Sequence, residues 1–222
     1  MSDSAPQEDA TSSPFALTTE EVRVLGVLIE KAFLTPDVYP LSVNGLVTGC
    51  NQLTGREPVL QLTESQVQDA LDSLIAQRWA TRRDQAGARV AKYEHLVRMR
   101  HSLPQPEQAV LAILLLRGPQ TAGEIRQRIE RLHAFADTAA VESVLEHLAD
   151  KFPSLARQLP RAPGTKEPRW AHLLAGEPDL DSLGETDARM AASGGLASRV
   201  AALEAEVQAL REELTAFRKQ FD

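Results

Sequence analysis

An internal repeat restricts the fold of this 222-residue chain more than any other feature of its sequence. Three predicted helix starts match the capping box, in which Ser or Thr is followed three residues later by Glu or Gln; they lie at Thr18, Thr63 and Thr121. Ser42 and Asp137 are suited to cap two more helices. The apolar positions after Thr63 recur after Asp137 at a constant offset of 74 residues: Val67, Leu71 and Leu74 against Val141, Leu145 and Leu148.

Each predicted group of helices is followed by two strand-like runs joined by a turn. The runs are residues 79–83 and 88–93 in the first group, and residues 155–159 and 169–174 in the second. Three helices followed by a β-hairpin are typical of the winged helix, a helix-turn-helix variant. We therefore predict a mainly helical α+β fold that contains two tandem winged-helix domains.

The last 27 residues carry a strict heptad pattern. Apolar side chains recur at alternating spacings of four and three residues: Leu196, Val200, Leu203, Val207, Leu210, Leu214, Phe217 and Phe221. Two apolar positions per heptad are typical of a coiled-coil seam, although a helix folded back on its own chain remains the alternative. β-Branched residues at the a positions and Leu at the d positions favour a parallel homodimer, and a trimer is not excluded.

These patterns predict five parts of the chain. They are a disordered acidic N-terminus at 1–16, winged-helix domains at 17–103 and 104–175, a flexible linker at 176–195 and the coiled-coil helix at 196–222. The acidic surplus lies at the ends: the chain has a net charge of −7, whereas its middle, from residue 22 to 176, is slightly basic. An acidic chain is not expected to coat nucleic acid by bulk charge alone.

Several longer motifs resemble the YceH family, bacterial proteins of uncharacterised function. They are residues 25–31 (LGVLIEK), 35–42 (TPDVYPLS), 50–52 (CNQ), 56–59 (REPV), 163–169 (PGTKEPR) and 172–174 (HLL). The resemblance covers about residues 17–175. It implies a tandem winged-helix fold and a cytoplasmic location, and it implies no reaction. At residues 53–55 (LTG) the chain departs from a basic and polar stretch that is common in the family.

No set of side chains in the sequence is suited to catalysis. Cys50, the single cysteine, is predicted to lie at a helix C-terminus, where the helix dipole disfavours a thiolate, and no His is close to it in sequence. We expect the neighbouring family-motif residues, Asn51, Gln52, Arg56 and Glu57, to tie their loop by hydrogen bonds. No metal-ligand spacing and no phosphate-binding glycine motif is present, so we expect no catalytic residue, metal or cofactor.

Basic residues gather on both predicted hairpins, the wings of the two domains. The candidate phosphate contacts are Arg82, Arg83, Arg89 and Lys92 on the first hairpin, and Arg161, Lys166 and Arg169 on the second. A solvated hairpin edge is the alternative reading of these charges. The third helix of each group is acidic and lacks basic residues, which disfavours ordinary major-groove readout.

We therefore expect a non-enzymatic cytoplasmic protein that self-associates and acts as a regulator through weak contact of its wings with double-stranded DNA. The alternative is a protein–protein interaction adaptor with no nucleic-acid role, because winged-helix units also bind proteins and a fold does not fix a function. Residues 1–15 lack the basic and apolar parts of a signal peptide, and no apolar run is long enough to span a membrane.

Overall fold

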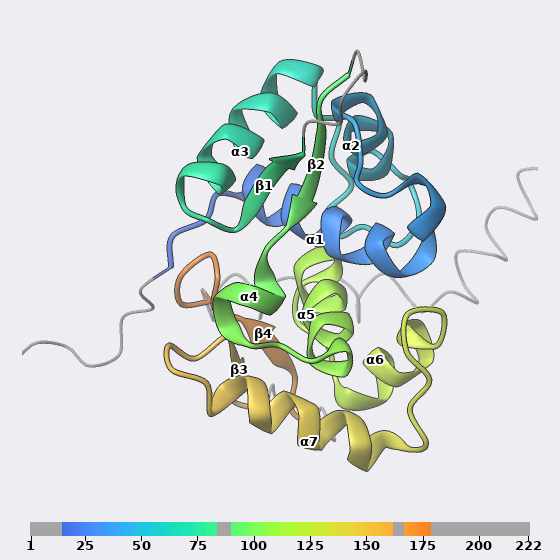
Figure 1. Ribbon diagram of the computed structural model, residues 1–222. Coiled ribbons are helices and arrows are strands. Elements are labelled where there is room, and N and C mark those ends of the chain that lie inside the picture. The colour runs from blue at the N-terminus through green and yellow to red at the C-terminus, as the bar shows by residue number, and fades with distance from the viewer. Residues whose placement is uncertain (1–14, 84–89, 162–166, 179–222) are drawn as a thin grey trace, which may run out of the picture. The chain divides into compact units, whose positions relative to one another are not determined.

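The computed structural model describes residues 15–83, 90–161 and 167–178 (Figure 1). The chain divides into residues 1–178 and residues 179–222, and all of the second unit lies outside the described residues. The predicted coiled-coil seam, most of the predicted linker and the candidate wing residues Arg89 and Lys166 are therefore outside the part described here. No helix in the described ranges is long and apolar enough to cross a bilayer.

Two successive segments of the chain each contain three α-helices and then an antiparallel hairpin (Figure 1). The elements of the first repeat are α1 (Thr19–Leu34), the 3-10 helix η1 (Pro36–Val38), α2 (Val43–Cys50), α3 (Glu64–Ala76), β1 (Ala80–Arg83) and β2 (Lys92–His95). Those of the second are α5 (Gln105–Arg117), α6 (Ala122–Ile129), α7 (Thr138–Ala149), β3 (Ala156–Gln158) and β4 (Trp170–His172). The described chain is thus a mixed helical α+β structure.

The predicted helix starts are confirmed. Thr18, Thr63 and Thr121 each form both hydrogen bonds of a capping box, and Ser42 and Asp137 accept a backbone N–H at the starts of α2 and α7. These bonds satisfy N–H groups that have no partner within the helix. The sequence therefore marks where five of the helices begin.

The structure differs from the prediction in several element bounds and in one additional helix. The helix α6 ends at Ile129, after which the chain turns and Leu132 and Phe135 pack against the core. The second strand of the first hairpin begins at Lys92, where its pairing with Arg83 starts. A five-residue helix, α4 (Val97–His101), links the repeats and was not predicted, because it has no side-chain cap.

The two hairpins share details that go beyond element order. A single bridge adds Leu41 beside Tyr93 in the first repeat and Gln120 beside Trp170 in the second, so each hairpin gains a short third segment. Two residues after each bridged aromatic residue lies a histidine, His95 or His172, and each histidine is paired with an alanine on the facing strand. The repeat is therefore preserved in the register of its strands.

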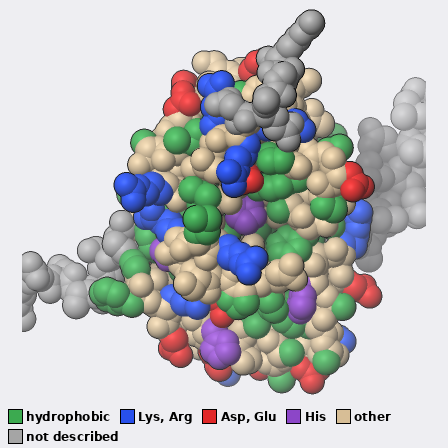
Figure 2. All heavy atoms as spheres, viewed as in Figure 1, with side chains coloured by type: hydrophobic (Ala, Val, Ile, Leu, Met, Phe, Trp, Pro, Cys, Tyr) green, Lys and Arg blue, Asp and Glu red, His purple; other side chains and the backbone are tan. Residues whose placement is uncertain are grey.

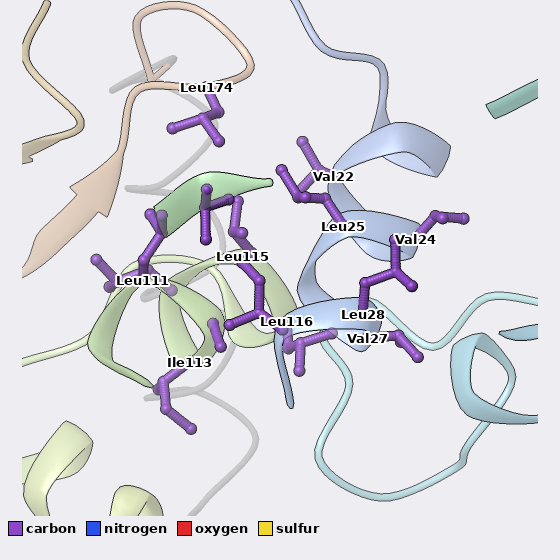
Figure 3. Packing of buried hydrophobic residues seen from close by; sticks show 14 of the residues in the cluster. Val22, Val24, Leu25, Val27, Leu28, Leu111, Ile113, Leu115, Leu116 and Leu174 are labelled. Atoms are coloured by element: carbon purple, nitrogen blue, oxygen red, sulfur yellow. The ribbon is translucent and has the colours of Figure 1, made fainter. Parts of the chain in front are cut away.

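The repeats share one hydrophobic core, in which α1 packs against α5. Leu25 and Leu28 of α1 face Leu115 and Leu116 of α5 (Figure 3), and all four are buried. Gly26 allows this close approach, since a Cβ atom at that position would lie 2.9 Å from Leu116 Cδ2 and 3.1 Å from Leu115 Cβ. Helix packing thus joins the two repeats into one body.

Candidate nucleic-acid interface

The first hairpin presents basic side chains at the surface. Arg82 and Arg83 are exposed on β1, and Lys92 is partly buried on β2. Arg83 forms an ion pair with Glu94 on the facing strand, with Nη2 and Oε1 2.8 Å apart, yet 61% of its side chain remains exposed. An exposed pair of this kind contributes little to stability and leaves the guanidinium accessible to an anion.

The helix α4 extends this basic region. Arg98 and Arg100 are exposed on α4, and the exposed Arg78 follows α3 with a left-handed φ of 61°. The Arg100 guanidinium lies 4.4 Å from the centre of the buried Trp79 ring and donates a hydrogen bond to the Gln77 carbonyl. Burial, and then the charge of Arg78, lower the pKa of Arg100.

The resulting surface, which we call the basic face, is formed by Arg78, Arg82, Arg83, Arg98 and Arg100. Figure 2 shows Lys and Arg side chains over the part of the molecule where Figure 1 places β1, β2 and α4. Three of these five residues come from outside the strands, and two of the three, Arg98 and Arg100, lie on α4, which the sequence patterns did not predict.

The third helix of the first repeat presents the opposite charge. Glu64, Asp69 and Asp72 of α3 are exposed, and Asp72 accepts a hydrogen bond from the Gln68 side chain at 2.8 Å. Glu142 and Glu146 are exposed on α7, which carries no Lys or Arg. These carboxylates repel phosphates, so neither helix is suited to enter a groove of DNA.

The basic residues of the second hairpin form more interactions within the protein. Arg157 forms an ion pair with Glu177, and Arg169 donates a hydrogen bond to the Pro119 carbonyl at 3.2 Å. Arg161 is exposed, and Lys166 lies outside the described residues. The two hairpins therefore offer unequal surfaces to a polyanion.

The family-motif loop between α2 and α3 is organised by a buried arginine. Arg56 forms a two-pronged ion pair with Glu30 of α1, through Nη1 to Oε1 at 3.1 Å and Nη2 to Oε2 at 2.6 Å. It also donates to the Gln52 side chain and to the Gly49 and Gly55 carbonyls. These bonds use all three guanidinium nitrogens, so Arg56 holds the loop against α1.

Two more side chains complete this attachment. Asn51 bonds both ways with the backbone of Leu62, accepting from its N–H at 2.7 Å and donating to its carbonyl at 2.9 Å. The buried Arg23 donates to the carbonyls of Cys50 and Pro58. The Glu57 N–H donates to Leu116 of α5 at 2.8 Å, which ties the loop to the second repeat. The loop is thus built as a rigid structural element.

Cys50 is unsuited to act as a nucleophile. Its side chain is completely buried, and burial raises the pKa of the thiol to about 12, an effect that the nearby Arg23 and Arg56 only partly oppose. The thiol is therefore protonated at neutral pH. Burial, more than the helix dipole, is the cause. Within the described ranges, no group of three His, Cys, Asp or Glu side chains is arranged to hold a metal ion.

Comparison with known proteins shows the family to which the sequence belongs. Residues 17–165 match the family model described as "Protein of unknown function, DUF480". The chain is 62% identical to a UPF0502 protein of Azoarcus sp. (strain BH72) over 213 residues, which cover 96% of this chain and 94% of the relative. It is 50% identical to a UPF0502 protein of Herminiimonas arsenicoxydans over 232 residues, which cover 100% of this chain and 98% of the relative.

The chain therefore belongs to the DUF480 family of bacterial proteins, whose members include the UPF0502 proteins. This agrees with the family resemblance found in the motifs, which spans nearly the same residues. The family description assigns no function, so any activity must be argued from the geometry of this chain.

Proposed function

We propose that this chain is a tandem winged-helix protein that binds double-stranded DNA through the phosphates, using the basic face of its first repeat. The winged-helix assignment is supported by the order of three helices and a hairpin in both repeats, and by the bridge that adds a third segment to each hairpin. The same order is the sequence signature of this helix-turn-helix variant.

The observation that carries the proposal is the separation of charge within the first repeat. Five exposed arginines lie on β1, on α4 and just after α3, whereas the charged residues of α3 are all acidic. Arginines at the surface suit phosphate contacts, which position a protein on a duplex without reading its sequence. The proposed binding is therefore weak, insensitive to sequence and sensitive to salt.

Fluorescence anisotropy with a labelled duplex tests this proposal. We expect binding at about 50 mM salt that weakens steeply as salt rises, because counterions are released from the DNA. The double variant Arg82→Gln/Arg98→Gln should flatten the salt dependence, by about 0.9 in logarithmic slope for each lost phosphate contact. The matched control is Arg157→Gln/Arg161→Gln, which removes the same charge from the second hairpin.

The outcomes separate the alternatives. A small effect of the control and a large effect of the first pair support the basic face. Equal losses would contradict its location on the first repeat. A complete absence of binding at about 50 mM salt would exclude the DNA function, and strong sequence preference would contradict binding through phosphates alone.

A second candidate, an adaptor for protein partners, is favoured by one observation. Phe152, three residues after the end of α7, is fully exposed, and Met99 on α4 is 80% exposed. Large apolar side chains at the surface are common at protein interfaces. Pull-downs from the native cell, with and without nuclease, decide between the two: a partner retained after nuclease and lost in Phe152→Ser favours the adaptor.

Self-association through the heptad pattern of residues 196–222 completes the proposal. The support is the sequence pattern alone, since these residues lie outside the described part of the chain. Light scattering should give twice the monomer mass for the full chain and a lower mass after deletion of 177–222. A monomeric full-length chain would contradict the coiled coil.

A further inference from the structure

A cleft of about 770 Å³ lies where the two repeats meet. The first repeat contributes the end of α1 and the loop at residues 52–56, and the second contributes the ends of α5 and α6 with the turn that follows α6. The volume is within the usual range of small-molecule sites, about 300–1,000 Å³. The cleft exists because Arg56 and the Glu57 N–H hold the loop against both repeats.

The charged side chains that line the cleft are predominantly basic. They are Lys31, Arg56, Arg117, Arg128 and Arg131, with Glu30 as the single acidic residue of the lining. The Glu30 carboxylate is already bound by both terminal nitrogens of Arg56, and Lys31 lies 3.4 Å from it. Glu30 therefore does not neutralise the arginines that come from the second repeat.

Arg117 and Arg128 stand close enough to repel each other. Burial lowers the pKa of Arg117, and the charge of Arg128 lowers it further, while the opposing effect of Glu57 is smaller. Glu57 is 4.0 Å from Arg117, and its side chain is 55% exposed, so this ion pair is weak. An anion between the two guanidinium groups would relieve this repulsion.

The helix dipole accounts for only part of this arrangement. Lys31, Arg117 and Arg128 each lie in the last turn of a helix, where a positive charge offsets the partial negative charge of the C-terminus. That effect acts on each helix separately and does not require the three helix ends to meet in one cleft. The helix dipole therefore does not account for their convergence.

Gly55 keeps this part of the cleft open. Its φ of +75° is in the left-handed region that favours glycine, and a Cβ atom there would lie 3.2 Å from the Arg117 Nη2. A larger residue would strain the loop and crowd the guanidinium. The loop conformation and the position of Arg117 are therefore coupled.

The remaining lining gives the cleft an apolar side. It is formed by Leu34, Leu53, Ile113, Leu116 and Leu132. Leu53 is 77% exposed, so its side chain is accessible to a bound molecule. A ligand that fills the cleft should therefore combine an anionic group with an apolar body.

We propose that this cleft binds a small organic phosphate, with Arg117, Arg128 and Arg131 contacting the phosphate and the leucine-rich side contacting the apolar body. Phosphate fits better than a carboxylate, because it carries more charge and more acceptor oxygens for several guanidinium groups. The site is distinct from the basic face and does not depend on DNA binding.

Titration calorimetry on the full chain tests the site with phenyl phosphate as the probe. Inorganic phosphate and benzoate serve as comparisons that lack the apolar body and the phosphate, respectively. We expect phenyl phosphate to bind most tightly, and the variant Arg117→Gln/Arg128→Gln to weaken its binding by about tenfold or more, equivalent to about 1.4 kcal/mol. The matched control is Arg126→Gln/Arg157→Gln, which removes the same charge at exposed positions outside both the cleft and the basic face and should leave binding unchanged.

A second variant protects the test against misfolding. Arg128 also donates a hydrogen bond to the buried Gln120 side chain, so its loss can disturb the fold. Arg131 is exposed, and Arg131→Gln should weaken phenyl phosphate binding without changing the thermal midpoint of the free protein. Any of three results overturns the proposal: a dissociation constant weaker than about 10 mM, equal weakening in the control, or benzoate binding as tightly as phenyl phosphate.

Discussion

The two repeats have the same order of elements but distribute polar groups differently. Among the described residues, the buried arginines, Arg23 and Arg56, both belong to the first repeat, where they bind the last carbonyls of α2 and the loop that follows. The corresponding connection in the second repeat, residues 130–137, is shorter. The second repeat instead contributes α5, in which every residue from Glu107 to Leu116 is buried.

This difference indicates how the repeats divide their roles. A helix that is buried on all sides belongs to the centre of a protein, and α5 serves the cores of both repeats through its contact with α1. Because α5 supplies apolar burial, the first repeat can carry a buried ion pair and a long polar loop. That loop in turn forms one side of the basic cleft.

The largest expected effect comes from breaking the buried ion pair of the first repeat. Arg56→Gln removes the guanidinium from the partly buried Glu30, which keeps Lys31 at 3.4 Å, and also removes the bonds to the Gly49 and Gly55 carbonyls. Removing one partner of a buried pair typically lowers the free energy of unfolding by about 3–5 kcal/mol. Urea unfolding followed by tryptophan fluorescence measures this loss.

The control is Arg83→Gln, which breaks the exposed pair with Glu94 on the first hairpin. Its effect should be no more than about 1 kcal/mol. Similar effects of the two substitutions would show that the loop network does not carry the stability assigned to it.

A smaller effect is expected from crowding the contact between the repeats. Gly26→Ala introduces a Cβ atom 2.9 Å from Leu116 Cδ2, and neither α1 nor α5 has free space there. We expect a loss of about 1–3 kcal/mol, despite the better helix propensity of alanine. The free energy of urea unfolding is again the measurement.

The matched control for Gly26 is Gly45 in α2. A Cβ atom there would lie 3.5 Å from Ser42 Oγ, an ordinary contact, so Gly45→Ala should be neutral or stabilising. A neutral Gly26→Ala variant would mean that α1 and α5 do not pack as closely as described.

The smallest expected effect is a pH dependence of stability, and it comes from a histidine that occupies the same place in both hairpins. Burial lowers the pKa of His95 and of His172 to about 4, and the Nδ1 atom of each is buried without a hydrogen-bond partner in the structure. An unfolded histidine binds its proton near pH 6.5. The unfolded state therefore binds more protons between these values, and stability falls as the pH falls from about 6.5 to about 4.

At pH 5.5 each histidine should lower the free energy of unfolding by about 1 kcal/mol or less. The effect is this small because both residues are partly exposed to solvent. His95→Gln and His172→Gln should each reduce the slope of stability against pH by a similar amount. His101, whose pKa burial also lowers to about 4, adds to the slope that remains. A variant with an unchanged slope would show that its histidine is protonated in the folded protein.

Local signals in the sequence predicted local structure well. The capping residues and the spacing of apolar positions located the helices, because each pattern acts within a few residues of the chain. The helix α4 was missed for the same reason, since it has five residues and no side-chain cap. The sequence patterns therefore did not place Arg98 and Arg100 on a helix.

The cleft could not be predicted, because its residues come from separate parts of the chain. Lys31, Arg117 and Arg128 look like ordinary basic residues at helix ends, and only the packing of α1 against α5 brings them together. Arg56 was expected to tie its loop, but its burial against Glu30 depends on a contact 26 residues away. Long-range packing of this kind leaves no pattern in a single sequence.

The packing of α1 against α5 should make the two repeats one cooperative unit. The chain has two tryptophans, both buried: Trp79 in the first repeat and Trp170 in the second. In the variants Trp79→Phe and Trp170→Phe, fluorescence therefore reports on one repeat at a time. Urea unfolding followed by fluorescence and by circular dichroism should give coincident midpoints within each variant. An earlier transition of one repeat, seen in either variant, would contradict the shared core and the cleft that depends on it.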